Sequence, residues 1–285
     1  MKHASPDAGT RLYGLFGDPV EHSLSPLLHN TLFREKGINA AYLAFRVKSD
    51  WLGLAFESMR AIGIAGVNLT IPHKEDAIEF VDDIPEDVDR AVGALNTVVN
   101  RDGQLLGYNT DVPGFLMALR EELDFDAGGK SIVVTGAGGA ARSVVFALAR
   151  TGAERIYIVN RTAERAEGLA EYASSFFPKT QIEPAAPQGP DLKKISLVVN
   201  ATSLGMHAGD ALPVDLAEFG AHTRVYDVVY SAETPLLKAA KSAKMRHADG
   251  LGMLVNQAAI AFELWTGERK GVRESMMETI KKCRS

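Results

Sequence analysis

Lys74 and Asp111 are the two side chains in this sequence best suited to moving a proton at a secondary alcohol. Oxidising such an alcohol requires a group that takes the hydroxyl proton as hydride leaves, and the reverse reaction returns that proton. A free lysine has a pKa of about 10.4, and a nearby carboxylate keeps it charged. We therefore expect Asp111 to orient the ammonium and Lys74 to stabilise the developing alkoxide. Spacing alone leaves open that Lys74 is an ordinary surface residue on a polar helix turn.

Other polar side chains follow predicted strands at their carboxyl ends, where ligands bind in open α/β sheets. Most are hydroxyls or amides, which suit a polyhydroxylated small molecule better than an apolar ligand or a metal. Each also has an ordinary structural interpretation, since Ser25 could cap a helix, Asn96 could fill a turn and Thr70 could simply belong to a strand. Their shared position favours a binding site made of Ser23, Ser25, Asn68, Thr70 and Asn96.

A glycine-rich loop, Gly136-Ala137-Gly138-Gly139-Ala140, follows the β-branched run 132–134 and precedes a helix-like segment. Glycine permits a tight turn and lets bare backbone approach a pyrophosphate at the positive end of a helix. The match to G-x-G-x-x-G is imperfect, and Ala141 occupies the last position of the motif. The loop predicts a dinucleotide site, with a glycine turn in an ordinary α/β unit as the alternative.

The segment after the next predicted strand bears on the choice of cofactor. NAD-binding loops usually place an acid there to hold the ribose 2′-hydroxyl, whereas this chain has Asn160-Arg161-Thr162, with Arg165 one helical turn further on. A carboxylate would repel a 2′-phosphate, and arginines would pair with it. The pattern favours NADP(H) over NAD, with two solvated arginines at a helix start as the alternative.

Two sections of alternating strands and helices must position these groups, which predicts an α/β fold with two domains. Residues 1–112 form an N-terminal α/β substrate domain, and residues 113–249 form a Rossmann-like, doubly wound dinucleotide-binding domain. The helices expected at 253–265 and 273–283 could belong to either domain, because periodicity does not decide this.

Local signals set the expected elements. In the first domain, Ser25 should cap a helix with Pro26 at its first position, and Asp50 should cap the next helix. A helix bearing His73, Lys74 and Glu75 should begin at Ile71-Pro72, and Asp102-Gly103 should turn a hairpin. Strands are expected at 11–16, 41–47, 66–70, 131–134, 155–160, 195–200 and 224–229, and further helices at 113–123, 140–150 and 234–245.

Composition excludes several classes of protein. A net charge of −5 argues against nucleic-acid and membrane-surface partners, and no apolar run reaches the roughly 18 residues of a membrane span. The single cysteine, Cys283, and the polar stretch 1–10, which lacks the apolar core of a signal peptide, make the cytoplasm the expected location. The 7 histidines have no zinc-type spacing, so no metal is expected. The oligomeric state is left open, a homodimer included.

Short motifs in one order along nearly the whole chain resemble those of the shikimate dehydrogenase family. They are residues 23–26, 68–74, 93–97, 109–111, 136–140, 160–162, 200–206, 227–230 and 250–254. So many motifs in one order are far more specific than a glycine loop. The resemblance implies reversible NADPH-dependent reduction of 3-dehydroshikimate to shikimate, in the chorismate route to aromatic amino acids.

The same resemblance implies roles, carried over position by position. Ser23, Ser25 and Thr70 would hold the substrate carboxylate and hydroxyls, and Lys74 and Asp111 would be the catalytic pair. The rest of the ring would be fixed by Asn96, Asp111, Tyr230 and Gln257. The cofactor would be bound by Gly136, Ala137, Gly138, Gly139, Ala140, Asn160, Arg161, Thr162 and Arg165, with Val228 and Gly250 near the nicotinamide. In this family the C-terminal helix packs on the first domain, so residues 250–285 would complete it, and the active site lies in the interdomain cleft.

Two positions depart from the family pattern. Val112 follows Asp111 where the family more often has glycine, and Ser231-Ala232-Glu233 replaces a common Tyr-x-Pro, which leaves the loop around Tyr230 open. A quinate/shikimate enzyme using NAD predicts an acid after the second strand, where Arg161 stands. A regulatory homologue that lost catalysis predicts loss of Lys74 or Asp111, and both are present. A folate-type dehydrogenase would not explain the Ser-x-Ser loop.

Overall fold

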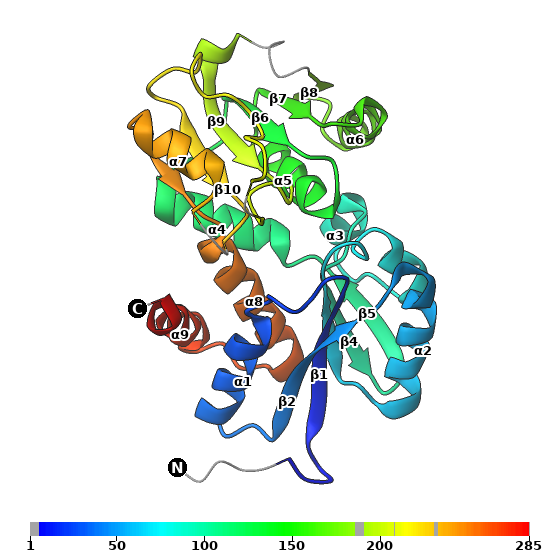
Figure 1. Ribbon diagram of the computed structural model, residues 1–285. Helices are drawn as coiled ribbons and strands as arrows, with labels where there is room; N and C mark the ends of the chain where they lie inside the picture. The colour runs from blue at the N-terminus through cyan, green and yellow to red at the C-terminus, as the bar shows by residue number, and fades with distance from the viewer. Residues whose placement is uncertain (1–5, 186–190, 208, 231–232, 285) are drawn as a thin grey trace. The chain divides into compact units, whose positions relative to one another are not determined.

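A computed structural model describes residues 6–185, 191–207, 209–230 and 233–284 of the chain (Figure 1). The chain divides into two compact units. Unit 1 comprises Met1–Thr110 and Val255–Ser285, and unit 2 comprises Asp111–Leu254. Ser231 and Ala232, which belong to the segment that departs from the family pattern, lie outside the described residues.

Unit 1 is built on a five-stranded sheet with the order β2-β1-β3-β4-β5. Strands β2, β1 and β3 run parallel, and β4 and β5 form the predicted antiparallel hairpin, in which Arg101 pairs with Gln104 across Asp102-Gly103. Both turn residues have positive φ, 52° and 94°, as a two-residue hairpin of this kind requires. The strands are β1 (Arg11–Gly17), β2 (Ala40–Arg46), β3 (Gly66–Leu69), β4 (Thr97–Arg101) and β5 (Gln104–Tyr108).

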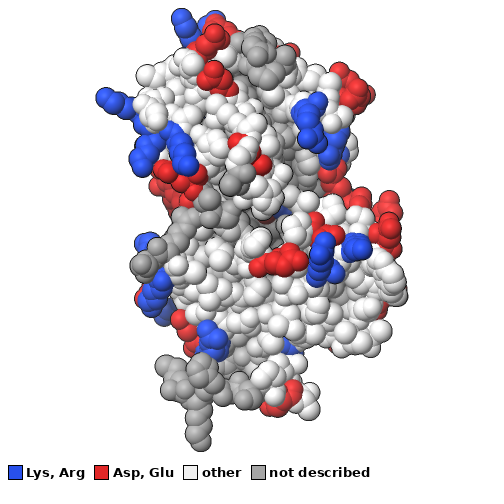
Figure 2. Space-filling model, viewed as in Figure 1, with Lys and Arg blue, Asp and Glu red and all other residues white. Residues whose placement is uncertain are grey.

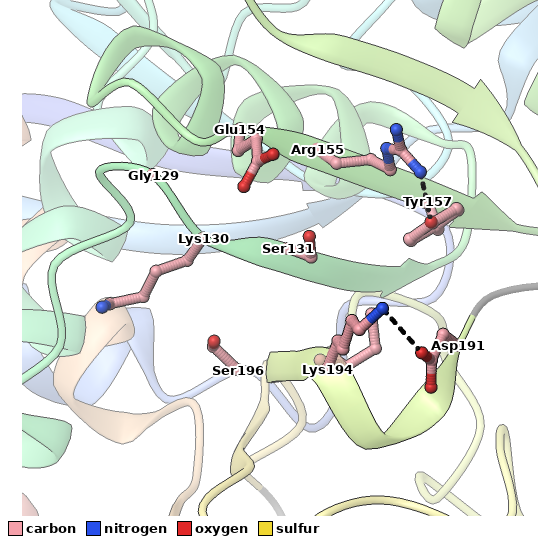
Figure 3. A pocket seen from close by; sticks show the side chains of 10 residues that line it. Gly129, Lys130, Ser131, Glu154, Arg155, Tyr157, Asp191, Lys194 and Ser196 are labelled. Carbon is pink, nitrogen blue, oxygen red and sulfur yellow. Dashed lines mark hydrogen bonds and ion pairs between the residues drawn. The ribbon is translucent and has the colours of Figure 1, made fainter.

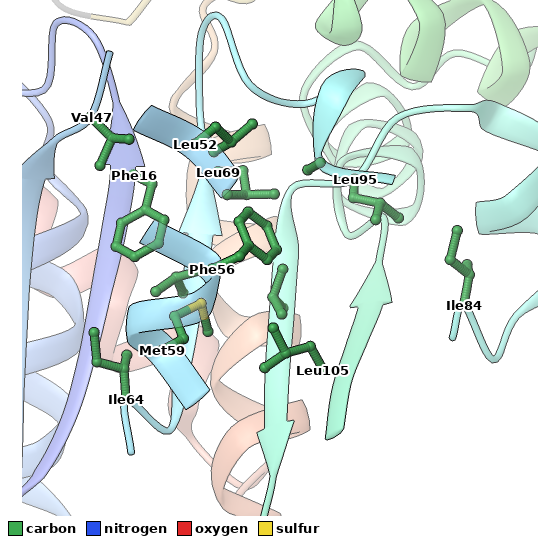
Figure 4. Packing of buried hydrophobic residues seen from close by; sticks show 13 residues of the cluster. Phe16, Val47, Leu52, Phe56, Met59, Ile64, Leu69, Ile84, Leu95 and Leu105 are labelled. Carbon is green, nitrogen blue, oxygen red and sulfur yellow. The ribbon is translucent and has the colours of Figure 1, made fainter. Parts of the chain in front are cut away.

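Side chains alternate across this sheet and divide its two faces. Phe16, Val67 and Val98 face a hydrophobic cluster that also contains Phe56 and Met59 of α2 (Figure 4). The helical elements that follow β2 and β3 are η1 (Ser49–Trp51), α2 (Leu52–Ile62), η2 (Asp76–Phe80) and α3 (Asp87–Val92).

The other face of the sheet is covered by an aromatic cluster. Tyr13 of β1 packs on Phe33 and Trp265 with ring centroids 5.3 and 5.1 Å apart, and Trp265 Nε1 donates to Val98 O at 3.0 Å. His29 is buried here and stacks on Tyr42 at 4.5 Å. The helices on this face are α1 (Ser25–Glu35), α8 (Leu251–Thr266) and α9 (Val272–Arg284), and α9 packs on α1.

Unit 2 contains a six-stranded parallel sheet with the order β11-β10-β9-β6-β7-β8. Counted along the chain from β6, this is the order 3-2-1-4-5-6 of a doubly wound sheet, with its switch point between β6 and β9. The strands are β6 (Ser131–Thr135), β7 (Arg155–Val159), β8 (Gln181–Pro184), β9 (Ile195–Asn200), β10 (Arg224–Asp227) and β11 (His247–Ala248). The predicted α/β fold class is confirmed.

Helices cover both faces of this second sheet (Figure 1). Helices α4 and α5 pack side by side, and Phe115 of α4 lies edge-on to Tyr226 of β10 at 5.3 Å. On the opposite face, Leu236 of α7 joins a cluster with Val198 and Val225. The helical elements are α4 (Asp111–Leu123), α5 (Gly139–Arg150), α6 (Ala163–Phe176), η3 (Leu192–Lys194) and α7 (Pro235–Ser242).

Five expectations about local structure were wrong. Ser25 is the first residue of α1 and not its cap, since Leu24 occupies the cap position. Asp50 lies inside η1, and Trp51 precedes α2. The strand that follows β7 is β8 and not β9, and α7 ends at Ser242, since Lys244 adopts a positive φ of 57°. The fifth is the helix expected to begin at Ile71-Pro72, where residues 71–75 form a turn.

Candidate active site

The chain segments that leave β1 and β3 are hydrogen-bonded to each other at the carboxyl edge of unit 1. Thr70 N donates to Phe16 O at 2.9 Å, and Asp18 N donates to Ile71 O at 2.9 Å. Thr70 is half-buried at the end of β3. The turn that follows Asp18 carries Ser23, whose hydroxyl accepts from the Ser25 N–H, and Ser25 is buried. The predicted serines and threonine therefore follow the ends of neighbouring parallel strands.

Asn96 is the centre of a buried polar network at the same edge. Its Nδ2 donates to Thr110 Oγ1 at 2.9 Å and to Gln257 Oε1 at 3.2 Å, and its Oδ1 accepts from Thr110 N at 2.7 Å. Its carbonyl accepts from Asn68 Nδ2 at 3.1 Å, and Asn68 Oδ1 accepts from the Tyr42 hydroxyl at 2.8 Å. The structure thus brings together Asn96 and Gln257, which are predicted site residues 161 positions apart.

Lys74 lies in a turn and not in the helix expected from the sequence. Its carbonyl accepts from Leu95 N at 2.7 Å, which removes it from any helical ladder, and the first helical residues after it form η2 from Asp76. This bond holds the Lys74 backbone beside the residue that precedes Asn96. His73 is buried with its Nε2 2.7 Å from Val47 O, consistent with a structural residue.

Asp111 follows Thr110 directly and is buried as the first residue of α4. By compactness it belongs to unit 2, whereas Lys74 and Asn96 belong to unit 1. The pairing of Lys74 with Asp111 stays a prediction.

The glycine-rich loop of unit 2 has a conformation in which the protein backbone could approach a ligand closely. Gly136 has a φ of 108°, and a Cβ there would stand 2.8 Å from Ala201 O, so no other residue fits. Gly138 precedes α5 in extended conformation, and α5 then begins at Gly139. Gly138, Gly139 and Ala140 are half-buried, which leaves backbone at the start of α5 partly open to solvent.

Arg165 lies beside this loop. Its Nη2 is 4.0 Å from where a Cβ on Gly138 would stand, although 27 residues separate the two positions in the chain. Asn160 Nδ2 donates to Thr162 O at 2.8 Å, and Arg165 N donates to Thr162 O at 3.2 Å, so the 160–165 segment is a compact turn. Arg161 is exposed after β7. The Arg165 guanidinium thus lies beside the glycine loop, and Glu164 is the one acid in the 160–165 segment.

Val228 and Gly250 are in direct contact in unit 2. A Cβ on Gly250 would stand 2.0 Å from Val228 O, so glycine is needed for the chain before α8 to pass the end of β10. Tyr230 is half-buried two residues further on.

A hollow of about 360 Å³ lies elsewhere on unit 2 (Figure 3). It is lined by residues at the amino ends of β6, β7 and β9, the edge opposite to the glycine loop. Two of its cations have partners, since Arg155 donates to the Tyr157 hydroxyl at 3.0 Å and Lys194 pairs with Asp191 at 3.1 Å. None of the predicted site residues lines it, and ligands of such sheets bind at the carboxyl edge.

Charge and metal-ligand patterns can be stated for the described parts of the chain. On the face in Figure 2, lysines and arginines lie among aspartates and glutamates and do not gather in one basic patch. Among the described residues, no three His, Cys, Asp or Glu side chains come together as a metal site needs. In those same residues, no helix is long and apolar enough to cross a bilayer.

Comparisons with known proteins decide the family. The chain matches the shikimate dehydrogenase substrate binding domain over residues 15–98, the shikimate / quinate 5-dehydrogenase domain over 119–204, and the shikimate 5′-dehydrogenase C-terminal domain over 250–281. A protein of Geobacillus kaustophilus named shikimate dehydrogenase (NADP(+)) is 44% identical over 96% of this chain and 99% of its own length. The chain belongs to the shikimate dehydrogenase family. The predicted family is therefore confirmed.

Solved members of the shikimate dehydrogenase family share the fold. A shikimate dehydrogenase in complex with NADP+ superposes with a TM-score of 0.89 at 38% identity, covering 98% of each chain. The Thermus thermophilus shikimate 5-dehydrogenase, in complex with NADP(H) and shikimate, gives a TM-score of 0.82 at 34% identity, covering 95% of this chain and all of that one (100%).

Two polar residues of these sites were not predicted. Thr110 bonds to Asn96 through both its N–H and its hydroxyl, and its place beside Asp111 in the sequence was the available signal. Asp227 is a fully buried carboxylate at the end of β10, and the available signal was an acid inside the strand predicted at 224–229.

Proposed function

We propose that this protein is an NADP-dependent shikimate dehydrogenase, which reversibly reduces 3-dehydroshikimate to shikimate in the chorismate route to aromatic amino acids. The observation that carries this proposal is the 44% identity, over nearly the full length of both chains, to a relative named shikimate dehydrogenase (NADP(+)). Both units are needed for the proposed reaction, and family matches fall in both.

Unit 1 supplies most of the substrate site in this proposal. The hydroxyls of Ser23, Ser25 and Thr70 bind the substrate carboxylate and ring hydroxyls. Asn96 and Gln257 hold each other at 3.2 Å, so their remaining polar groups are oriented before substrate arrives, which reduces the entropy cost of binding. Tyr230 and Asp111, assigned to unit 2, complete the set.

Lys74 carries the proton chemistry. When bound, NADPH supplies the hydride that the carbonyl carbon accepts. Lys74 donates a hydrogen bond from its ammonium to the carbonyl oxygen and passes a proton to it as the alkoxide develops. Asp111 accepts a hydrogen bond from the same ammonium, which orients it toward the carbonyl oxygen. In the direction of shikimate oxidation, the same pair takes the hydroxyl proton back.

The residues of unit 2 fit an NADP cofactor. The backbone from Gly136 to Ala140, which is partly open to solvent from Gly138 onward, receives the pyrophosphate at the start of α5, where unpaired N–H groups and the helix dipole favour an anion. The 2′-phosphate is held by Asn160, Arg161, Thr162 and Arg165, and the Arg165 guanidinium beside Gly138 brings its charge close to the loop. Val228 and Gly250, packed together, border the nicotinamide.

The cellular setting is part of the proposal. Cys283 is exposed and unpaired, as in a reducing compartment, and the cytoplasm also holds the NADPH that the reaction consumes. We retain a homodimer as the hypothesis for its assembly, which sedimentation at micromolar concentration would test.

A spectrophotometric assay tests the function. NADPH formation is followed with shikimate, with quinate and with neither, and the set is repeated with NAD+. We expect shikimate with NADP+ to be preferred. Turnover with quinate and NAD+ alone would instead favour a quinate dehydrogenase, and no turnover with any pair would favour a non-catalytic homologue.

Substitution of Lys74 tests the mechanism. Lys74→Ala should lower kcat by ~10²-fold or more while the KM for shikimate changes little, because the ammonium acts mainly on the developing alkoxide. Lys48→Ala, which removes an exposed lysine of the same unit, is the matched control and should keep wild-type kinetics. Normal kcat in the Lys74 variant would contradict the proposed role.

A further inference from the structure

A buried polar network that none of the proposed roles uses is centred on Asp227, the last residue of β10. The Asp227 side chain is fully buried. Its Oδ1 accepts from Asn200 Nδ2 at 2.9 Å and from Val229 N at 3.0 Å, and its Oδ2 accepts from Thr234 Oγ1 at 2.6 Å. Burial raises the pKa of this carboxyl, and the three donors oppose that rise. A carboxylate is tolerated in such a place only when it is hydrogen-bonded in this way.

Asn200 extends the network to the neighbouring strands. It is the last residue of β9, and its Oδ1 accepts from Thr135 Oγ1, at the end of β6, at 3.1 Å. Its Oδ1 also accepts from Thr202 Oγ1 at 2.7 Å, and its Nδ2 donates to Leu204 O at 3.1 Å. The network therefore ties together the carboxyl ends of β6, β9 and β10, which is the ligand-binding edge of a doubly wound sheet.

Thr234 fixes the chain where it returns to the sheet after β10. Its hydroxyl donates to Asp227 and accepts from Leu237 N at 3.2 Å, so it caps α7 at the same time. On the outgoing side, Val228 N donates to Asn200 O at 2.9 Å, and Val229 N donates to the Asp227 carboxylate. Both ends of the segment from 228 to 234 are thus anchored on one carboxylate.

We propose that Asp227 is a positioning residue for turnover, because it holds Val228 against the nicotinamide and Tyr230 toward the substrate. This inference rests on the proposed function. Neither Asp227 nor Thr234 is proposed to touch substrate or cofactor, and each acts through residues 228–230. A displacement of about 1 Å at a reacting centre can cost ~10²-fold in rate, so loosening this anchor should appear in kcat.

Three substitutions separate positioning from stability. Thr234→Val keeps the shape of the side chain and removes the donor to Asp227. Thr234→Ser keeps that donor. Thr223→Val is the matched control, because Thr223 is also fully buried in unit 2 and its hydroxyl donates to Ile195 O at 2.7 Å, at the amino edge of the sheet. Kinetics of shikimate oxidation with NADP+, urea unfolding, and binding of adenosine 2′,5′-bisphosphate are measured for each protein.

We expect kcat to fall about 10-fold or more in Thr234→Val, as for loss of a hydrogen bond to a charged group, and to stay within about twofold of wild type in Thr234→Ser and Thr223→Val. Both valine variants should lose stability, whereas binding of adenosine 2′,5′-bisphosphate should not change, since the glycine loop and Arg161 are untouched. If Thr234→Val does not fold, Thr234→Ala is measured in its place, because alanine also removes the donor to Asp227 and puts no methyl group where the hydroxyl was.

Two different outcomes would contradict these expectations, one for the positioning role and one for the proposed function. An active wild-type protein whose Thr234→Val variant has the same kcat as Thr223→Val overturns the positioning role alone. A wild-type protein that does not oxidise shikimate with NADP+ contradicts the proposed function itself, whatever the variants do.

Discussion

His29 should make the stability of unit 1 fall as the pH is lowered. Its ring is fully buried, stacked on Tyr42 at 4.5 Å and next to Trp265 at 5.2 Å. Neither ring nitrogen has a hydrogen-bond partner among the residues that the structure describes. Burial lowers the pKa of His29 from 6.5 to about 3. Between these two pH values the unfolded chain binds a proton that the folded protein does not, so the free energy of unfolding decreases as pH falls below 6.5.

The size of the effect follows from the two pKa values. Each pH unit between them is worth about 1.36 kcal/mol, which gives a full loss of roughly 5 kcal/mol once the pH is below both. At pH 5 the folded histidine is still neutral, so the loss is set by the unfolded pKa alone and amounts to about 2 kcal/mol. Above the unfolded value the contribution disappears.

Tryptophan fluorescence can measure this change in unit 1 alone. Both tryptophans, Trp51 and Trp265, belong to unit 1, so their emission during urea unfolding reports that unit. The free energy of unfolding is compared at pH 7 and pH 5 for wild type, for His29→Phe and for His22→Gln, which changes an exposed histidine of the same unit.

Wild type and His22→Gln should both lose about 2 kcal/mol more than His29→Phe between pH 7 and pH 5. The comparison does not depend on how well phenylalanine packs, because packing shifts the stability equally at both pH values. An equal loss in wild type and in His29→Phe would show that His29 is not the buried neutral group that the packing implies.

Two further substitutions test unit 2. Arg165→Ala should raise the KM for NADP+ about 10-fold or more and leave the KM for NAD+ nearly unchanged, because NAD+ lacks the 2′-phosphate; equal effects on both cofactors in steady-state kinetics would refute a phosphate contact. Gly168→Ala should raise the free energy of unfolding by about 0.5–1 kcal/mol in urea titrations, because Gly168 is inside α6 and a Cβ there meets nothing within 4 Å. Loss of stability would mean that the backbone there needs glycine.

The elements with strong periodic signals were predictable, and short elements with mixed signals were not. β6 is a run of β-branched residues that is buried at both faces. Asp102-Gly103 specifies the hairpin of β4 and β5 through positive φ. β8 escaped prediction because, of its four residues, only Ile182 is buried, and an edge strand needs no apolar face. Its partner β7 supplies the pairing, which no local pattern reveals.

The turn at Lys74 shows why tertiary pairing limits prediction of a site. The residues after Ile71-Pro72 have the composition of a helix start, and a local rule therefore predicts a helix. The Leu95 N–H competes for the Lys74 carbonyl and takes it at 2.7 Å, so the backbone pairs across the unit and not along a helix. This competing bond is also what sets Lys74 beside Asn96.

Long-range hydrogen bonds carry the part of the site that residue types alone leave undetermined. Asn96 and Gln257 each have an ordinary interpretation by themselves, and only the folded chain brings their amides to 3.2 Å with Thr110 between them in the network. A buried amide must find partners for its donors and acceptor, so one position in such a network restricts the others. Asp227 obeys the same rule, because a buried carboxylate needs its three donors, and these come from Asn200, Val229 and Thr234. The polar residues of these sites are accordingly constrained by each other's hydrogen bonds as much as by the ligands proposed for them.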